Sequence, residues 1–269
     1  MATPVLAAVD GTPDSGPAVR WAAEEAERQG RPLRLVHAWG RPEHLAPALP
    51  GVSEVRGRAL AALAGEAARV RSEHPAVPVE TALLEVPAPR GLLAEAEHAA
   101  LVVVGTHRPR GLPGLFLGSV GLAVAARTTR CPVVLVPPRA REQPGPVVVG
   151  VDPVRPSGTA VAFAAREARV RELTARAVSA WPQPGCWDDI GEDERASVAH
   201  AELERLGRVL PGPLRTAARA LPGRPSTVLL AASADAALLV LGRSGRRLGP
   251  VAGEVCEYAV CPVAIVPDA

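Results

Sequence analysis

Five segments of this sequence occur twice, in the same order along the chain. Val5-Leu-Ala-Ala-Val-Asp10 returns as Val147-Val-Val-Gly-Val-Asp152, and Cys131-Pro-Val-Val-Leu-Val-Pro137 returns as Cys261-Pro-Val-Ala-Ile-Val-Pro267. The other three begin at Trp21, Val36 and Leu101 and have counterparts at 163–168, 178–181 and 238–242. A chain of 269 residues can hold two domains that each bury a core. We therefore predict two copies of one fold, 1–139 and 146–269, joined by a polar, Pro-rich linker.

Apolar runs alternate with amphipathic segments in both copies. The runs are short and nearly continuous, as in the buried strands of a parallel sheet. In copy one we expect strands at 4–9, 32–39, 78–85, 101–104 and 132–136, and helices at 15–29, 52–72, 89–98 and 119–129. In copy two we expect strands at 146–151, 173–180, 214–221, 237–241 and 262–266. This alternation predicts doubly wound α/β domains, in which ligands bind beyond the carboxyl ends of the strands, where the strand order reverses.

Composition excludes several classes of protein. The chain is 48% hydrophobic and 22% charged, as globular proteins are, and its net charge of +2 is too small to argue for nucleic-acid binding. The sequence has no Lys, which excludes a Walker-type P-loop and Schiff-base chemistry. No apolar run approaches the roughly 20 residues of a membrane span. With no visible secretory signal and no metal-ligand spacing among cysteines 131, 186, 256 and 261, we expect a cytoplasmic protein that binds neither membrane nor nucleic acid.

The segment that follows the fourth strand of copy one carries the most chemistry. It runs from Gly105 to Ser119 with further glycines between them, and these let the backbone approach a ligand closely. Ser119 would cap the next helix, whose N-terminus suits a phosphate, and Arg108 and Arg110 add positive charge. On this segment alone, a phosphate site and a plain loop with a helix cap both remain open.

The wider pattern resembles the universal stress protein family, once per copy and over nearly the whole chain. The resemblance lies in Val-Asp-Gly-Thr-Pro-Asp-Ser after strand one, His-Ala-Trp at the end of strand two, the glycine loop, and the closing Cys-Pro-Val-Val-Leu-Val strand. It implies a tandem member with two Rossmann-like domains, of the adenine nucleotide alpha hydrolase-like class, packed as an intramolecular pseudo-dimer. In nucleotide-binding members, the motif Gly-x2-Gly-x9-Gly-Ser/Thr holds the phosphates of ATP, and the ends of strands one and two hold the adenosine.

Carried over to copy one, this resemblance implies a site with a single mismatch. Asp10 and Ala38 would contact the adenosine, and Gly105, Gly118 and Ser119, with Val120 beside it, would hold the phosphates. Arg108 stands where the family has its second glycine. If that position needs a positive φ, a non-glycine residue costs about 1 kcal/mol, which an arginine near phosphates could offset.

Copy two departs further from the motif. Gly242 and Gly249 are 7 positions apart, whereas Gly105 and Gly118 are 13 positions apart. Pro250 replaces Ser119, which removes a hydroxyl and a backbone N–H together. We therefore expect copy two to have lost triphosphate binding and to serve as a non-binding partner domain.

The remaining polar residues favour no catalytic centre. Asp10 and Asp14 could form an acidic metal pair, but a strand-end Asp that organises its own turn is the simpler interpretation. We expect His37 in the core, His107 in the loop without a catalytic role, and Trp39 at the pocket edge, with adenine stacking as the alternative. The matching Cys131 and Cys261 are expected to pack rather than to react.

These expectations combine into a stress-response protein that binds ATP as a regulatory ligand and is not an enzyme. Whether Mg²⁺ accompanies the nucleotide and whether slow hydrolysis occurs stay open, as do a protein partner and a homodimer of the tandem chain. The alternative is a scaffold of the same fold that binds no nucleotide. An ATPase or nucleotidyl transferase has less support, because no base or metal cluster accompanies the loop.

Overall fold

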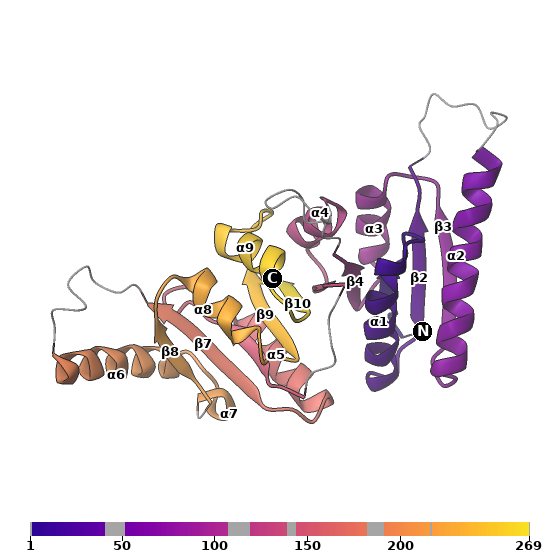
Figure 1. Cartoon of the computed structure of the whole chain (residues 1–269). Helices are drawn as coiled ribbons and strands as arrows, with labels where there is room; N and C mark the ends of the chain where they lie inside the picture. The colour runs from indigo at the N-terminus through magenta and orange to yellow at the C-terminus, as the bar shows by residue number, and fades with distance from the viewer. Residues whose placement is uncertain are drawn as a thin grey trace. The chain divides into compact units, whose positions relative to one another are not determined.

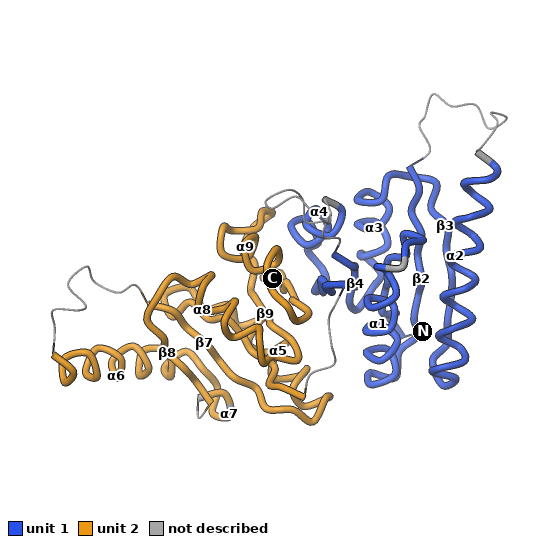
Figure 2. Tube along the Cα trace, in the orientation of Figure 1, with its two compact units in different colours: residues 1–140 blue, residues 141–269 orange. Residues whose placement is uncertain are grey.

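The computed structural model describes residues 2–40, 52–106, 119–138, 144–181, 191–215 and 217–268. The chain divides into two compact units, 1–140 and 141–269, and each is described by itself (Figure 2). The division falls in the Pro-rich segment between the two copies. The intramolecular pseudo-dimer stays a prediction.

Unit 1 alternates strands with helices from end to end (Figure 1). In chain order it contains β1 (Val5–Ala8), the 3-10 helix η1 (Pro13–Ser15), α1 (Gly16–Arg28), β2 (Leu33–Ala38), α2 (Val52–Glu73), β3 (Val79–Leu84), α3 (Ala88–Ala96), β4 (Leu101–Gly105), α4 (Ser119–Arg127) and β5 (Val133–Val136). The predicted strands and helices of copy one are confirmed, with ends that differ by a residue or two.

The unit 1 sheet is parallel and has the strand order β3-β2-β1-β4-β5. The chain steps outward from β1 to β3 and then returns across β1 to β4. Right-handed crossovers therefore place α1 and α2 on one face and α3 and α4 on the other, and each of these pairs is in mutual contact. The order reverses between β1 and β4, and this is where such folds bind ligands.

Helix α1 illustrates how the sequence sets the core. Its buried apolar residues recur every three or four positions and form one stripe toward the sheet. They are Ala18, Val19, Ala22, Ala23 and Ala26. The strands they cover are buried on both faces, as Val5, Leu35 and Val103 show with at most 1% exposure.

Unit 2 has the same architecture. Its elements are β6 (Val147–Gly150), α5 (Gly158–Val170), β7 (Ala175–Trp181), α6 (Glu192–Arg208), α7 (Gly212–Arg215), β8 (Arg219–Pro222), α8 (Pro225–Ala232), β9 (Leu238–Arg243), α9 (Pro250–Tyr258) and β10 (Val263–Pro267). The strand order β10-β9-β6-β7-β8 is again parallel and reverses between β6 and β9. Both units are therefore doubly wound α/β domains, as predicted.

One predicted strand of copy two is wrong over its first half. The segment 214–221 reads as a continuous strand, but the structure has the helical turn α7 first and limits β8 to Arg219–Pro222. The Pro at position 213 has the fixed φ that suits the start of a helix, and Leu214 turns into the core at 1% exposure. A leucine in the sequence predicts a buried position, but it does not tell whether that position belongs to a strand or to a helix.

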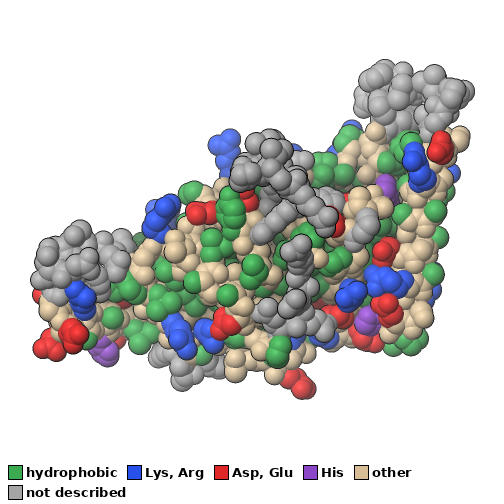
Figure 3. Space-filling model, in the orientation of Figure 1, with side chains coloured by type: hydrophobic (Ala, Val, Ile, Leu, Met, Phe, Trp, Pro, Cys, Tyr) green, Lys and Arg blue, Asp and Glu red, His purple; other side chains and the backbone are tan. Residues whose placement is uncertain are grey.

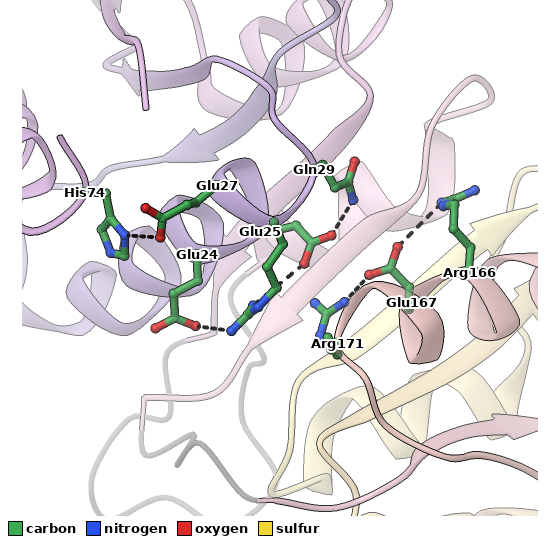
Figure 4. Close-up of polar contacts among 9 residues, drawn as sticks. Glu24, Glu25, Glu27, Gln29, His74, Arg166, Glu167 and Arg171 are labelled. Atoms are coloured by element: carbon green, nitrogen blue, oxygen red, sulfur yellow. Dashed lines mark hydrogen bonds and ion pairs between the residues drawn. The ribbon is translucent and has the colours of Figure 1, made fainter. Parts of the chain in front are cut away.

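The repeat extends to a buried carboxylate in the first helix of each unit (Figure 4). Glu25 on α1 and Glu167 on α5 are both fully buried. Gln29 donates a hydrogen bond to Glu25, and Arg171 donates one to Glu167. These partners offset part of the desolvation cost that a buried carboxylate carries. The sequence comparison aligns the two glutamates but does not indicate that they are buried.

Charged side chains of both signs lie interspersed on the face shown in Figure 3, without one large patch of either sign. This agrees with the small net charge of +2. Within the described ranges, no helix is both long and apolar enough to cross a membrane.

Candidate functional site

Unit 1 contains a cavity of about 320 Å³ at the carboxyl edge of its sheet, which we call the unit 1 cavity. It opens at the switch point, because its walls include the ends of β1, β2 and β4 together with parts of α3 and α4. Four of the predicted site residues line it: Asp10, Ala38, Gly105 and Val120. The fold thus brings together residues that are more than 100 positions apart in the sequence.

Asp10 lies two residues after the end of β1 and organises the turn that follows. Its Oδ1 accepts hydrogen bonds from the backbone N–H and the hydroxyl of Thr12, both at 2.8 Å. The next residue, Gly11, has a φ of +79°, which favours glycine. Asp14 also lines the cavity, but the described residues include no group of three His, Cys, Asp or Glu placed to hold a metal ion. The geometry therefore matches the turn interpretation of Asp10.

His37 lies in the cavity wall, where we expected a core residue. It is half-buried at the end of β2, and its Nδ1 is buried without a hydrogen-bond partner among the described residues. Burial lowers the pKa of His37, and the nearby Asp10 carboxylate opposes this by raising it. A buried ring nitrogen in a cavity can bond to a ligand. Sequence reasoning missed His37 because a strand interior and a strand end look alike within an apolar run.

Gly105 has a packing role that the motif does not reveal. A Cβ at this position would lie 3.2 Å from the backbone oxygen of Asp14 and 3.6 Å from the Cβ of Ala18. The end of β4 therefore packs closely against the start of α1. The counterpart Gly242 is tighter still, because its Cβ would lie 2.3 Å from the Cβ of Ser157. Packing thus leaves no room for a side chain at Gly242, and it leaves little room at Gly105.

The phosphate side of the predicted site is described only in part. Ser119 is the first residue of α4, one position after the N-cap position that the sequence predicts for it, and Val120 lines the unit 1 cavity. Arg108 and Gly118, together with His107, lie outside the described residues, and so does the side chain of Ser119. Trp39 is not among the described residues that line the cavity.

Unit 2 contains a cavity of about 520 Å³ at the equivalent switch point, which we call the unit 2 cavity. The ends of β6, β7 and β9 form its walls, with parts of α8 and α9. Asp152 lies two residues after β6, as Asp10 does after β1, and its Oδ1 accepts a hydrogen bond from the Val154 N–H at 2.9 Å. Unit 2 therefore retains a cavity at this position although its loop is shorter than that of unit 1.

Arginines distinguish the unit 2 cavity from the unit 1 cavity. Arg155, Arg243 and Arg247 line it together with Asp152, whereas the ionisable residues in the described wall of the unit 1 cavity are Asp10, Asp14 and His37. In the sequence, the adjacent pair Arg246-Arg247 could bind an anion or lie in a solvated turn. The structure separates the two, since Arg247 lines the cavity and Arg246 is not among its lining residues.

The comparisons with known proteins agree on one family. The sequence profile described as "Universal stress protein family" matches residues 1–137 and again residues 145–267. The chain belongs to the universal stress protein family. A universal stress protein of Mycobacterium tuberculosis (strain ATCC 25618 / H37Rv) is 32% identical over 97% of this chain and 95% of its own length. The predicted membership, with the family pattern present twice, is confirmed.

A solved structure that matches the full chain supports the same fold. A universal stress protein from Archaeoglobus fulgidus DSM 4304 matches all of this chain and all of its own with a TM-score of 0.72 at 12% identity. Another universal stress protein from Archaeoglobus fulgidus, solved in complex with dAMP, matches half of the chain at 24% identity with a TM-score of 0.40.

The cysteines of this universal stress protein that the structure describes are buried. Cys131, Cys256 and Cys261 are all at most 5% exposed, and burial raises the pKa of each thiol to about 12. Thiols of this kind are poor nucleophiles at neutral pH. The burial of Cys131 and Cys261 fits their expected packing role, and Cys186 lies outside the described residues.

Proposed function

We propose that this universal stress protein is a cytoplasmic stress-response protein that binds one ATP per chain in the unit 1 cavity as a regulatory ligand. The observation that supports this is the convergence of family motif and cavity. Asp10, Ala38 and Gly105, which the family pattern assigns to the nucleotide, line one space at the switch point together with Val120. Unit 2 would act as a partner domain that binds no ATP.

The described wall of the unit 1 cavity suits the adenosine end of the ligand. Its volume of about 320 Å³ lies in the range of small-molecule sites, and Leu92 of α3 and Val36 of β2 offer apolar surface to a base. The Asp10 carboxylate, held by Thr12, would accept hydrogen bonds from ribose hydroxyls. The buried Nδ1 of His37 is available for a further bond to the nucleoside.

The phosphates would lie toward the first turn of α4. Ser119 begins that helix, and the N–H groups of a helix N-terminus attract anions. Arg108 and Gly118 would contribute from the loop before it, as the family motif implies. The triphosphate of bound ATP would bring strong negative charge to this end of the cavity. The proposal does not specify whether Mg²⁺ binds together with the ATP.

The competing candidate is a scaffold of the same fold that binds no nucleotide. What favours it is Arg108, which stands where the family motif has its second glycine. The two candidates differ in one measurable quantity, the stoichiometry of ATP binding to the full chain.

Calorimetric titration of the full chain with ATP tests the proposal, with an expected stoichiometry of one. The double variant Gly118→Val/Ser119→Ala should bind at least about tenfold more weakly, because the valine blocks close approach and the alanine removes a charge-assisted hydrogen bond. The matched control is Gly249→Val/Pro250→Ala in unit 2, which should leave the affinity for ATP unchanged. Absence of ATP binding would favour the scaffold, and equal effects of both doublets would mean that the site is elsewhere.

A further inference from the structure

The unit 2 cavity combines a basic end with an apolar wall. Arg155 follows β6, Arg243 is the last residue of β9, and Arg247 belongs to the loop between β9 and α9. The cavity is also lined by apolar residues such as Val178, Ala180, Leu229 and Leu241. We propose that the unit 2 cavity is a second ligand site, which binds a small organic phosphate monoester through these three arginines.

The turn that follows β9 is held by a hydrogen bond from the last residue of that strand. Arg243 is 4% exposed and donates a hydrogen bond from Nη1 to the carbonyl of Gly245, whose φ is +73°. Desolvation by burial lowers the pKa of Arg243, and the neighbouring Asp268 carboxylate opposes this effect. A bound dianion would further stabilise the buried guanidinium. Arg155 and Arg247 are exposed, so their side chains can adjust to a ligand.

Helix α9 adds backbone donors at the same end of the cavity. Its N-cap is Gly249, which has no side chain to cap the first turn. Pro250 has no N–H, but Val251 and Ala252 line the cavity, and their N–H groups belong to the first turn, which has no partner within the helix. Donors and partial positive charge at this position suit an anion.

Helix α5, the other helix that begins near the cavity, is already capped. The Ser157 hydroxyl accepts a hydrogen bond from the Ala160 N–H, and Asp268 accepts hydrogen bonds from Ser157 and from Thr159. A carboxylate of the chain itself therefore takes the place that an anion would take at α5. This leaves the α9 end, beside Arg247, for the anionic group of the ligand.

The form of the cavity decides between classes of ligand. A triphosphate is disfavoured because the loop from Gly242 to Gly249 is short and the first residue of α9 is a proline. A single phosphoryl group matches the donors better than a carboxylate does, since it has three acceptor oxygens and close to two charges at neutral pH. The apolar wall and the volume of about 520 Å³ leave room for a compact apolar or aromatic body.

Phenyl phosphate is a suitable probe, titrated into the full chain by calorimetry. We expect saturable binding of one molecule per chain. The double variant Arg155→Ser/Arg247→Ser, which changes two exposed side chains and leaves the core intact, should bind at least about tenfold more weakly. The matched control is Arg246→Ser, since Arg246 is also exposed and adjacent but is not among the lining residues. Its affinity should stay within about twofold of the parent's.

Further titrations distinguish the unit 2 site from the ATP site and test the class of ligand. The unit 1 doublet Gly118→Val/Ser119→Ala should leave phenyl phosphate binding unchanged, so this result does not depend on whether unit 1 binds ATP. Inorganic phosphate and benzoate should each bind at least about tenfold more weakly than phenyl phosphate, because phosphate lacks the aromatic ring and benzoate lacks the phosphoryl group. Absence of saturable binding, retention of affinity in the Arg155/Arg247 variant, loss of affinity in the unit 1 doublet, or equal affinity for either fragment would overturn the proposal.

Discussion

Gly242 approaches Ser157 so closely that a Cβ on Gly242 would lie 2.3 Å from the Cβ of Ser157. This contact joins the end of β9 to the N-cap of α5, at the edge of the unit 2 cavity. In unit 1, Gly105 makes the equivalent but looser approach, 3.2 Å from the backbone oxygen of Asp14. The family motif assigns this glycine to phosphate binding, and in both units it also lies in a closely packed contact.

The first prediction is that Gly242→Ala destabilises unit 2, while Gly105→Ala has a smaller effect on unit 1. Overpacking of this kind typically costs about 1–3 kcal/mol, and the shorter contact at Gly242 should bring the larger cost. Gly253→Ala is the matched control, because a Cβ there meets no atom within 4 Å and alanine favours the interior of α9. Hydrogen exchange of peptides from each unit measures the effects separately. Equal protection in the Gly242→Ala and Gly253→Ala variants would contradict the packing argument.

The second prediction concerns the pH dependence of unit 1. The folded-state pKa of His37 lies below the ordinary value of 6.5 because of burial, so the unfolded chain takes up the proton first as the pH falls. The contribution of neutral His37 to stability is therefore present above pH 6.5 and is lost as the pH falls from there through the folded-state pKa. The free energy of unfolding, measured with denaturant at pH 7.5 and at pH 5.5, should differ less between these two pH values in His37→Gln than in the parent. An NMR titration that places the pKa of His37 above 6.5 would reverse the sign.

The repeated architecture follows from the sequence because strand burial repeats in it. Val5 and Val147, the first residues of β1 and β6, are both fully buried in runs with no polar alternation, and such runs are typical of central parallel strands. At 214–218 the same reasoning fails. There Leu214 belongs to a helical turn, and only the tertiary structure decides which element carries a buried leucine.

The candidate sites were predictable to different degrees. Asp10 and Ala38 reach the unit 1 cavity because strand ends of a parallel sheet meet at one edge. The basic lining of the unit 2 cavity was not predictable, because Arg246 and Arg247 are neighbours in the sequence and only Arg247 lines the cavity. The turn at Gly245, to whose carbonyl Arg243 donates a hydrogen bond, lies directly before this pair.

The third prediction is that the buried thiols resist alkylation in the native protein. A pKa of about 12 for Cys131, Cys256 and Cys261 leaves, at pH 8, about 1,000-fold less thiolate than an ordinary pKa of 9.0 would. In a Cys186→Ser background, labelling with a thiol-specific disulfide reagent should be slow, and it should become complete in denaturant. Rapid labelling of the native protein would show that at least one of these thiols is accessible.

The last prediction is that ATP acts on this protein as a ligand and not as a substrate. Rapid hydrolysis needs a positioned water and stabilisation of charge on the transferred phosphoryl group, usually by a metal ion. The segment from Gly105 to Ser119 contains no acidic residue, and the Oδ1 of Asp10 in the adjoining wall is bonded to Thr12. His107 is the residue of this segment that could serve as a general base. ATP should therefore stay intact and stabilise unit 1 by mass action, by about 2.7 kcal/mol at a hundred times its dissociation constant. A turnover assay with Mg²⁺ measures this, and sustained hydrolysis near about one per second that is abolished by His107→Ala would make the protein an enzyme.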